Sequence, residues 1–169
     1  ITGVAVGGLP DGIVDTDMLA ANAVSSAKLA SGAGGKVLQR VSTASTTTVT
    51  TSGSTTSELL NLSITPASTG SKILLLATCS VAITAGATNA FGVARIYRGD
   101  IASGTTLLQV MGGNGTAIYN HAAFPISFED SPSTTSATTY TLAIARGSQN
   151  TSSLTTNAVG YTLIALELA

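Results

Sequence analysis

Few side chains in this 169-residue sequence could take part in acid–base or nucleophilic chemistry. The only histidine is His121, and a catalytic histidine needs both a nucleophile and an orienting carboxylate. No G-x-S-x-G segment is present, so we interpret His121 as a structural residue. Glu129 and Asp130 precede Ser131-Pro132 and are expected in an exposed loop, and one adjacent carboxylate pair cannot flank a sugar. The sequence therefore predicts a protein that is not an enzyme and has no catalytic residue.

Metal and cofactor sites are not indicated either. Asp11, Asp15 and Asp17 lack the D-x-D-x-D-G spacing of a calcium loop. One cysteine, Cys79, and one histidine do not make a zinc-ligand set. The glycine-rich run 112–115 has no Lys-Ser/Thr after it, so it is expected to be a turn and not a phosphate loop. We expect no metal and no cofactor.

The tripeptide Arg98-Gly99-Asp100 matches an integrin-binding motif. A given tripeptide arises easily by chance in a chain of this length, and a hairpin corner favours Gly-Asp in any case. We therefore interpret these three residues as a turn between strands.

The composition indicates a chain that hides its surface in an oligomer. Charged residues make up 9% of the sequence, against about 25% in ordinary soluble domains. Mean hydropathy is +0.42, so a lone molecule would expose an adhesive surface, which contact with further copies would bury. The net charge of −1 gives no basic patch for nucleic acid, and no apolar run reaches the roughly 18 residues of a membrane span.

The first thirty residues repeat with a period of ten. Each block has valine in its fourth place and leucine in its ninth, which gives Val4, Leu9, Val14, Leu19, Val24 and Leu29. Two apolar residues per block are too few to close a core within one chain, so the repeat is expected to bury them against identical chains around a shared axis. We predict a stalk over 1–30 and a glycine hinge over 31–35; the alternative is a disordered Ala/Gly/Ser leader with chance periodicity.

The pattern is β throughout residues 36–169. Alternating and β-branched runs between turn residues predict strands at 36–42, 45–51, 57–65, 72–84, 89–98, 105–111, 116–128, 138–146 and 158–168. Evenly spaced strands without a long helical pattern favour an antiparallel β-sandwich of the jelly-roll type. The predicted fold class is all-β.

Two strands are apolar on both faces, which calls for a second cover. In 72–84 one face is wholly apolar and the other begins with leucines, and the last strand behaves similarly. One interpretation is a neighbouring subunit that packs on the second face, whose residues are Leu74, Leu76, Ile164, Leu166 and Leu168. The alternative is a middle strand between two sheets of one chain, and the sequence does not decide between them.

Several segments together resemble a known class of viral proteins. They are decads ending in Lys-Leu-Ala or a near variant, a glycine hinge, 35–39 (GKVLQ), 62–66 (LSITP), 71–75 (SKILL), 96–99 (IYRG) and 161–163 (YTL). This series resembles the distal head domains of bacteriophage tail fibres, head fibres and related structural proteins. The resemblance implies a homotrimeric virion appendage, with a repeat stalk followed by a β-sandwich knob. It leaves open attachment at the tail, a capsid vertex or a capsid face.

The expected function is that of a structural fibre in the virion, held by other virion proteins at its N-terminal end. Loops at the free end of the knob are candidates for binding a host-surface glycan, with Asn89, Asn114, Ser133, Thr134, Gln149 and Asn150 as candidate residues. One alternative is a capsid fibre or decoration protein with a display or stabilising role only. Another is a secreted carbohydrate-binding β-sandwich, although such modules usually stack sugars on exposed aromatics and this chain has no tryptophan.

Overall fold

The computed structural model describes residues 37–169 except 54, 86–89, 116–118, 148–150 and 157–159. The expected stalk, 1–30, and hinge, 31–35, lie outside the described residues. Ten strands are present in the described part: β1 (Val37–Ser45), β2 (Thr50–Ser52), β3 (Thr56–Ile64), β4 (Lys72–Ala85), β5 (Ala90–Arg98), β6 (Thr105–Gly115), β7 (Tyr119–Asp130), β8 (Thr138–Arg146), β9 (Thr151–Thr156) and β10 (Tyr161–Leu168). That part contains no helix long and apolar enough to cross a membrane.

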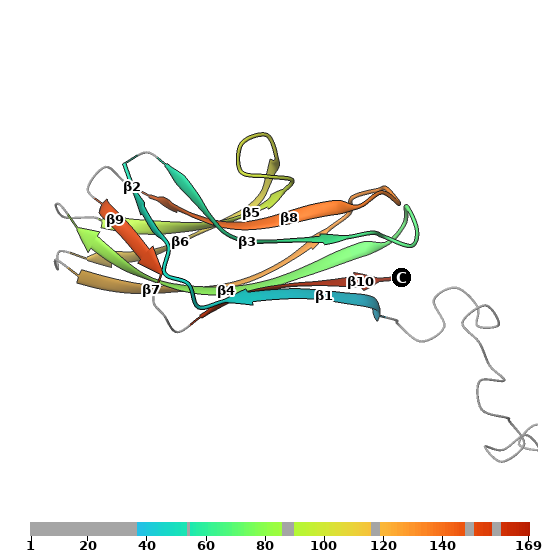
Figure 1. Ribbon diagram of the computed structural model, residues 1–169, viewed down its shortest axis with the longest axis horizontal. Coiled ribbons are helices and arrows are strands. Elements are labelled where there is room, and N and C mark those ends of the chain that lie inside the picture. Colours follow the sequence, from blue (N-terminus) through green and yellow to red (C-terminus); the bar gives the residue numbers. More distant parts are fainter. Residues whose placement is uncertain (1–36, 54, 86–89, 116–118, 148–150, 157–159) are drawn as a thin grey trace, which may run out of the picture. The chain divides into compact units, whose positions relative to one another are not determined.

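The strands form two antiparallel sheets that pack face to face (Figure 1). Sheet A has the order β1-β10-β4-β7 over one half of its length. Over the other half β9 takes the place of β10 beside β4, and β2 pairs with β9. Sheet B has the order β3-β8-β5-β6.

The strand order is that of a jelly roll. If β1 with β2 is one interrupted strand, and β9 with β10 is another, sheet A reads 1-8-3-6 and sheet B reads 2-7-4-5. These are the orders of a jelly roll, which wraps a long antiparallel pair into two facing sheets. The predicted fold class of the knob is therefore confirmed.

The break between β1 and β2 lies at the level where β9 ends and β10 begins, and hydrogen bonds close it. The Val49 N–H donates to Thr156 Oγ1 over 2.8 Å, and the Thr156 N–H donates to the Val49 carbonyl over 2.8 Å. The Tyr161 hydroxyl donates to the Thr47 carbonyl at 2.8 Å. The backbone can thus leave the regular ladder without burying unpaired polar groups.

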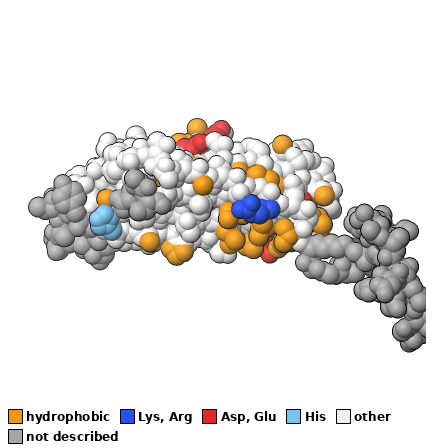
Figure 2. Space-filling model, turned by 60° about the horizontal axis from the view of Figure 1, so that its bottom comes forward, with side chains coloured by type: hydrophobic (Ala, Val, Ile, Leu, Met, Phe, Trp, Pro, Cys, Tyr) orange, Lys and Arg blue, Asp and Glu red, His pale blue; other side chains and the backbone are white. Residues whose placement is uncertain are grey.

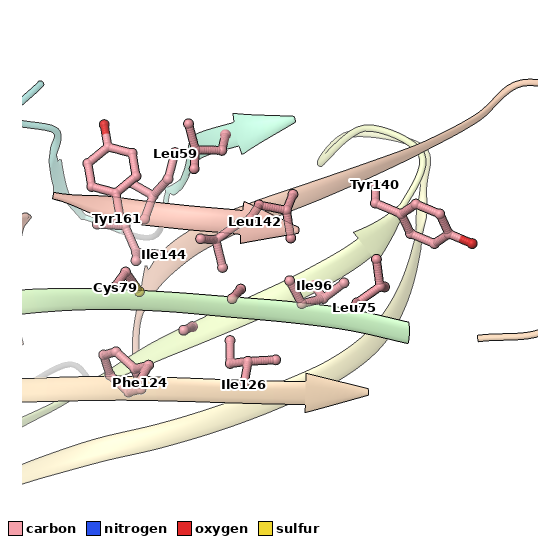
Figure 3. Close-up of a cluster of buried hydrophobic side chains, with 14 of the residues drawn as sticks. Leu59, Leu75, Cys79, Ile96, Phe124, Ile126, Tyr140, Leu142, Ile144 and Tyr161 are labelled. Carbon is pink, nitrogen blue, oxygen red and sulfur yellow. The ribbon is translucent and has the colours of Figure 1, made fainter. Parts of the chain in front are cut away.

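The core lies between the sheets and follows the alternation expected for β4. The inward residues of this strand, from Ile73 to Ile83, are at most 3% exposed. Sheet B faces them with Ile96, Leu142 and Ile144, all fully buried (Figure 3). Cys79 lies among these side chains as a free thiol.

Two strand predictions and one turn prediction needed correction. The expected strand 45–51 is regular only at its two ends, because Ser45 ends β1, residues 46–49 form the break, and β2 begins at Thr50. The segment Thr151–Thr156 had no predicted strand, yet it forms β9 inside sheet A. Residues 112–115, expected as a turn, belong to β6.

Candidate functional site

The outer face of sheet A carries an apolar strip across four strands. Directly opposed residues of antiparallel strands point to the same side, so the pairing registers define rows across the sheet. One row contains Arg40, Leu166, Leu74 and Glu129, from β1, β10, β4 and β7 in turn. The neighbouring rows are Ser42, Ile164, Leu76, Ser127 and Ala44, Thr162, Thr78, Pro125. We call these three rows, together with Leu168, the sheet A patch.

The sheet A patch is hollowed and only half-covered. Leu74, Leu76, Ile164, Leu166 and Leu168 are all half-buried. A shallow hollow of about 300 Å³ lies over the patch, and its lining residues include Leu76, Pro125 and Ile164. Figure 2 turns this side of the molecule forward and shows hydrophobic side chains gathered around one basic group.

The five leucine and isoleucine residues expected at a subunit interface therefore lie together on one outer surface. No strand among the described residues packs over that surface, so within the described part β4 and β10 have a sheet on one side only. What covers the patch stays a prediction. The row structure adds Arg40 and Glu129, which the sequence analysis did not place there.

The outer face of sheet B is built differently and covers itself. Ala143 and Val93, from its two central strands, are at most 1% exposed although no other described strand lies above them. The Arg95 side chain lies across this face, and its Nε donates to Gln109 Oε1 at 2.8 Å while Nη1 donates to Thr56 Oγ1 at 3.3 Å. A long polar side chain thus shields small residues and leaves a hydrated surface.

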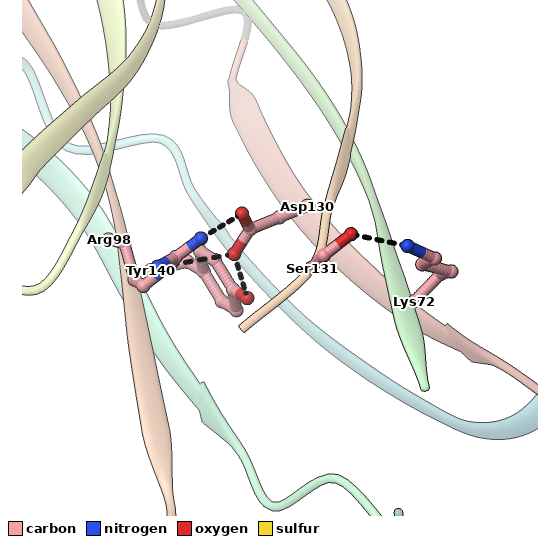
Figure 4. Close-up of polar contacts among 5 residues, drawn as sticks. All are labelled: Lys72, Arg98, Asp130, Ser131 and Tyr140. Carbon is pink, nitrogen blue, oxygen red and sulfur yellow. Dashed lines mark hydrogen bonds and ion pairs between the residues drawn. The ribbon is translucent and has the colours of Figure 1, made fainter. Parts of the chain in front are cut away.

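One charged cluster joins the two sheets at the end of the sandwich where β7 terminates. Asp130 is 4% exposed and accepts hydrogen bonds from the Arg98 guanidinium with both oxygens, one of them at 2.8 Å from Nε (Figure 4). The Tyr140 hydroxyl donates to the same carboxylate at 2.7 Å. Burial would raise the pKa of Asp130, but the bonds from Arg98 and Tyr140 hold it below its ordinary value. The expectation that Glu129 and Asp130 form an exposed loop is therefore wrong, because both residues belong to β7. Asp130 is buried there, and only Glu129 is exposed.

The integrin-type tripeptide has both of its charged side chains engaged within the chain. Arg98 is held by Asp130. Asp100 Oδ1 accepts hydrogen bonds from the N–H groups of Ala102 and Ser103 at 2.8 and 2.7 Å. These bonds lower the pKa of Asp100 and fix the β5–β6 turn, in agreement with its interpretation as a turn.

A second buried carboxylate was missed from the sequence. Glu167 in β10 is fully buried, and it accepts hydrogen bonds from Gln39 Nε2 at 2.6 Å and from the Ala67 N–H at 2.7 Å. Glu167 thereby links β10 to β1 and to the turn between β3 and β4. A signal was available, because Tyr161, Leu163 and Ala165 set an inward series that position 167 continues.

The candidate receptor residues do not form one group. Ser133 and Thr134 lie between β7 and β8, Asn114 lies in β6, and Asn89, Gln149 and Asn150 lie outside the described residues. β7 ends beside Ile73, at the same end of sheet A where β1 begins. The loop 131–137 is therefore at the end where the chain enters the knob, and its expected place at the free end is wrong.

The remaining side chains considered for chemistry are His121, Cys79 and the possible metal ligands. His121 is exposed in β7, opposite Ala82. Burial raises the pKa of the Cys79 thiol to about 12, which makes a thiolate nucleophile at neutral pH negligible. Among the residues that the structure describes, no group of three His, Cys, Asp or Glu side chains could hold a metal ion.

This chain resembles some solved viral structures at low sequence identity. No protein-family model matches this chain, and no curated protein matches it. Three similar solved structures come from infectious bursal disease virus: the Gx strain (17% identity, TM-score 0.39), a VP2 subviral particle (18%, 0.37) and the Gt strain (17%, 0.37). They cover 78%, 78% and 79% of this chain, which spans only 37% of the length of each. With these TM-scores, the jelly-roll assignment rests on the strand order of this chain itself.

Proposed function

We propose that this chain is a non-enzymatic structural protein of a bacteriophage particle. It forms a homotrimeric fibre in which residues 1–30 are the stalk and residues 36–169 are the knob. Other virion proteins hold its N-terminal end, and no metal, cofactor, nucleic acid or membrane takes part.

The sheet A patch is the observation that carries this proposal. It leaves five large aliphatic side chains half-covered in a chain with 9% charged residues, on an outer surface with no further strand above it in the described part. Contiguous apolar surface of this kind marks an interaction site in soluble proteins. The stalk repeat, with two apolar residues per ten, needs sister chains for the same reason.

The end of the knob far from Val37 is the proposed host-contacting end. β4 ends there, β5 begins there, and β6 and β9 have termini at the same level. The sequence between these strand ends is rich in Ser, Thr, Asn and Gly, which can hydrogen-bond sugar hydroxyls without a charge. Candidate residues in or beside these segments are Asn89, Asn114, Gln149 and Asn150.

Mass measurement in solution tests the oligomer. Multi-angle light scattering and native mass spectrometry of the full chain should give three times its 16.7 kDa mass. A stable monomer would contradict the fibre and favour a secreted carbohydrate-binding module.

Location and adsorption test the role. Antibody labelling of particles followed by electron microscopy should show the chain projecting from the virion. Purified protein should adsorb to host cells and compete with infection. Labelled particles without competition would leave a display or stabilising role and remove host attachment.

A further inference from the structure

The charges on the sheet A patch are arranged asymmetrically. Arg40 and Glu129 are both exposed and close one row at its two ends, with Leu166 and Leu74 between them. In this half of the sheet β1 and β7 are the edge strands. Three gaps between strands separate the two charges, or about 14 Å. Within this row the β1 edge of the apolar strip is positive and the β7 edge is negative. The next outward position of β4 is Lys72, opposite Leu168, and its ammonium group donates a hydrogen bond to Ser131 Oγ at 2.6 Å.

The chain also enters the knob beside this strip. β1 begins at Val37, which pairs with Leu168, and Val37 is 53% exposed. The sheet A patch therefore reaches the edge of sheet A at which β1 begins.

We propose that the occupant of the sheet A patch is a second copy of this chain, placed head-to-tail in a closed ring of three. Each patch faces the common axis, and the β1 edge of one protomer meets the β7 edge of the next. Arg40 of one protomer then pairs with Glu129 of its neighbour, three times around the ring. This inference rests on the proposed homotrimer and assigns its interface and its polarity.

The ring arrangement follows from the placement of the two charges. A heterologous contact joins two different surfaces, and rotation by one third of a turn closes it without leaving a free edge. Opposite charges on opposite edges fit such a contact, because every junction brings unlike charges together. The leucines supply the apolar surface removed from water, and the charge pairs set which edges meet.

Charge reversal tests the junction. Arg40→Glu and Glu129→Arg should each raise the apparent dissociation constant of the trimer by about tenfold or more, because each puts like charges at all junctions. The double variant on one chain should restore the trimer, since the pairs are only reversed. Both positions are exposed, so the fold should tolerate these changes; circular dichroism checks this.

A mixture of the two single variants distinguishes a ring of three from an even-numbered assembly. In a two-fold dimer or a ring of four, alternating the two variants pairs every charge correctly. Three is odd, so every mixed trimer keeps one junction with like charges. We expect the equimolar mixture to assemble less than the double variant; equal assembly would overturn the ring of three.

Glu58→Arg is the matched control. Glu58 is exposed on β3 of sheet B, so its reversal changes net charge as Glu129→Arg does but leaves the patch intact. This control should stay trimeric. A wild-type monomer would end the proposed fibre itself. If the wild-type protein is a trimer and neither single reversal weakens it, the proposed Arg40–Glu129 interface is wrong. The trimer contact would then lie in residues 1–36 or on another surface.

Discussion

The carboxylate of Asp130 in sheet A accepts a bidentate pair of hydrogen bonds from the guanidinium group of Arg98 in sheet B. The pair joins β7 to β5 across the end of the sandwich, and the Tyr140 hydroxyl completes it from β8 (Figure 4). In a chain with so few charges, this ion pair links the two sheets at the end of the sandwich where β1 begins.

Replacing this carboxylate should destabilise the fold. Asp130→Asn leaves the Arg98 guanidinium without its counter-charge, and breaking a fully buried pair costs about 3–5 kcal/mol. The Arg98 side chain is 36% exposed, so water compensates in part and we expect a loss of about 2 kcal/mol in the free energy of unfolding. Urea denaturation measures it. Tyr140→Phe removes one hydrogen bond and should cost about 1 kcal/mol. An unchanged free energy of unfolding in both variants would show that the contacts of Asp130 with Arg98 and Tyr140 do not stabilise the fold.

Acid should weaken the fold through Glu167. Burial would raise the pKa of this carboxyl, but the bonds from Gln39 and Ala67 hold it below its ordinary value of about 4.3. Its contribution is therefore complete above the unfolded-state pKa and is lost as the pH falls through the lower folded-state pKa. Glu167→Gln should be less stable at pH 7 and should lose less stability than wild type between about pH 5 and pH 3. If the free energy of unfolding falls with pH equally in the two proteins, Glu167 does not cause the loss of stability in acid.

The sequence predicted most strands because their burial pattern follows the pleat. β4 and β8 match their expected ranges to within one residue, since an unbroken apolar alternation has one phase that fits a core. The sequence did not predict β9, because TSSLTT contains only one apolar residue. Thr151 and Thr156 are nonetheless at most 1% exposed, and hydrogen bonds to the backbone of Phe91 and Val49 satisfy their hydroxyls. Such partners come from distant parts of the chain and leave no local pattern.

The charged residues show the same limit. Asp130 continues the apolar series Ala122, Phe124, Ile126 and Phe128 of β7, and it is buried against Arg98 whereas Glu129 is exposed. The alternation indicates which carboxylate points inward, but not that Arg98 and Tyr140 from sheet B lie opposite it. The apolar residues of the sheet A patch were identified from alternation alone, whereas its flanking charges required the pairing of four strands.

Cys79 should behave as an internal reporter of unfolding. Its side chain is 3% exposed and burial raises its thiol pKa to about 12, so a thiol-reactive probe should not label the native protein. Labelling should proceed only as fast as the sandwich opens, and it should accelerate with urea in step with the loss of circular dichroism. Rapid labelling in native buffer would show that the core around β4 is open.

The β5–β6 turn should not tolerate a side chain at Gly104. A Cβ there would lie 2.3 Å from the Asp100 carbonyl oxygen and 2.6 Å from that of Arg98, and both are backbone atoms that cannot rotate away. Gly104→Ala must therefore open the turn and disturb the strand that carries Arg98, at a cost of about 2 kcal/mol in the free energy of unfolding. Gly70→Ala is the control, since its Cβ would meet only Ser68 Oγ at 3.7 Å. Urea denaturation should separate the two variants, and equal midpoints would mean that the turn adapts without cost.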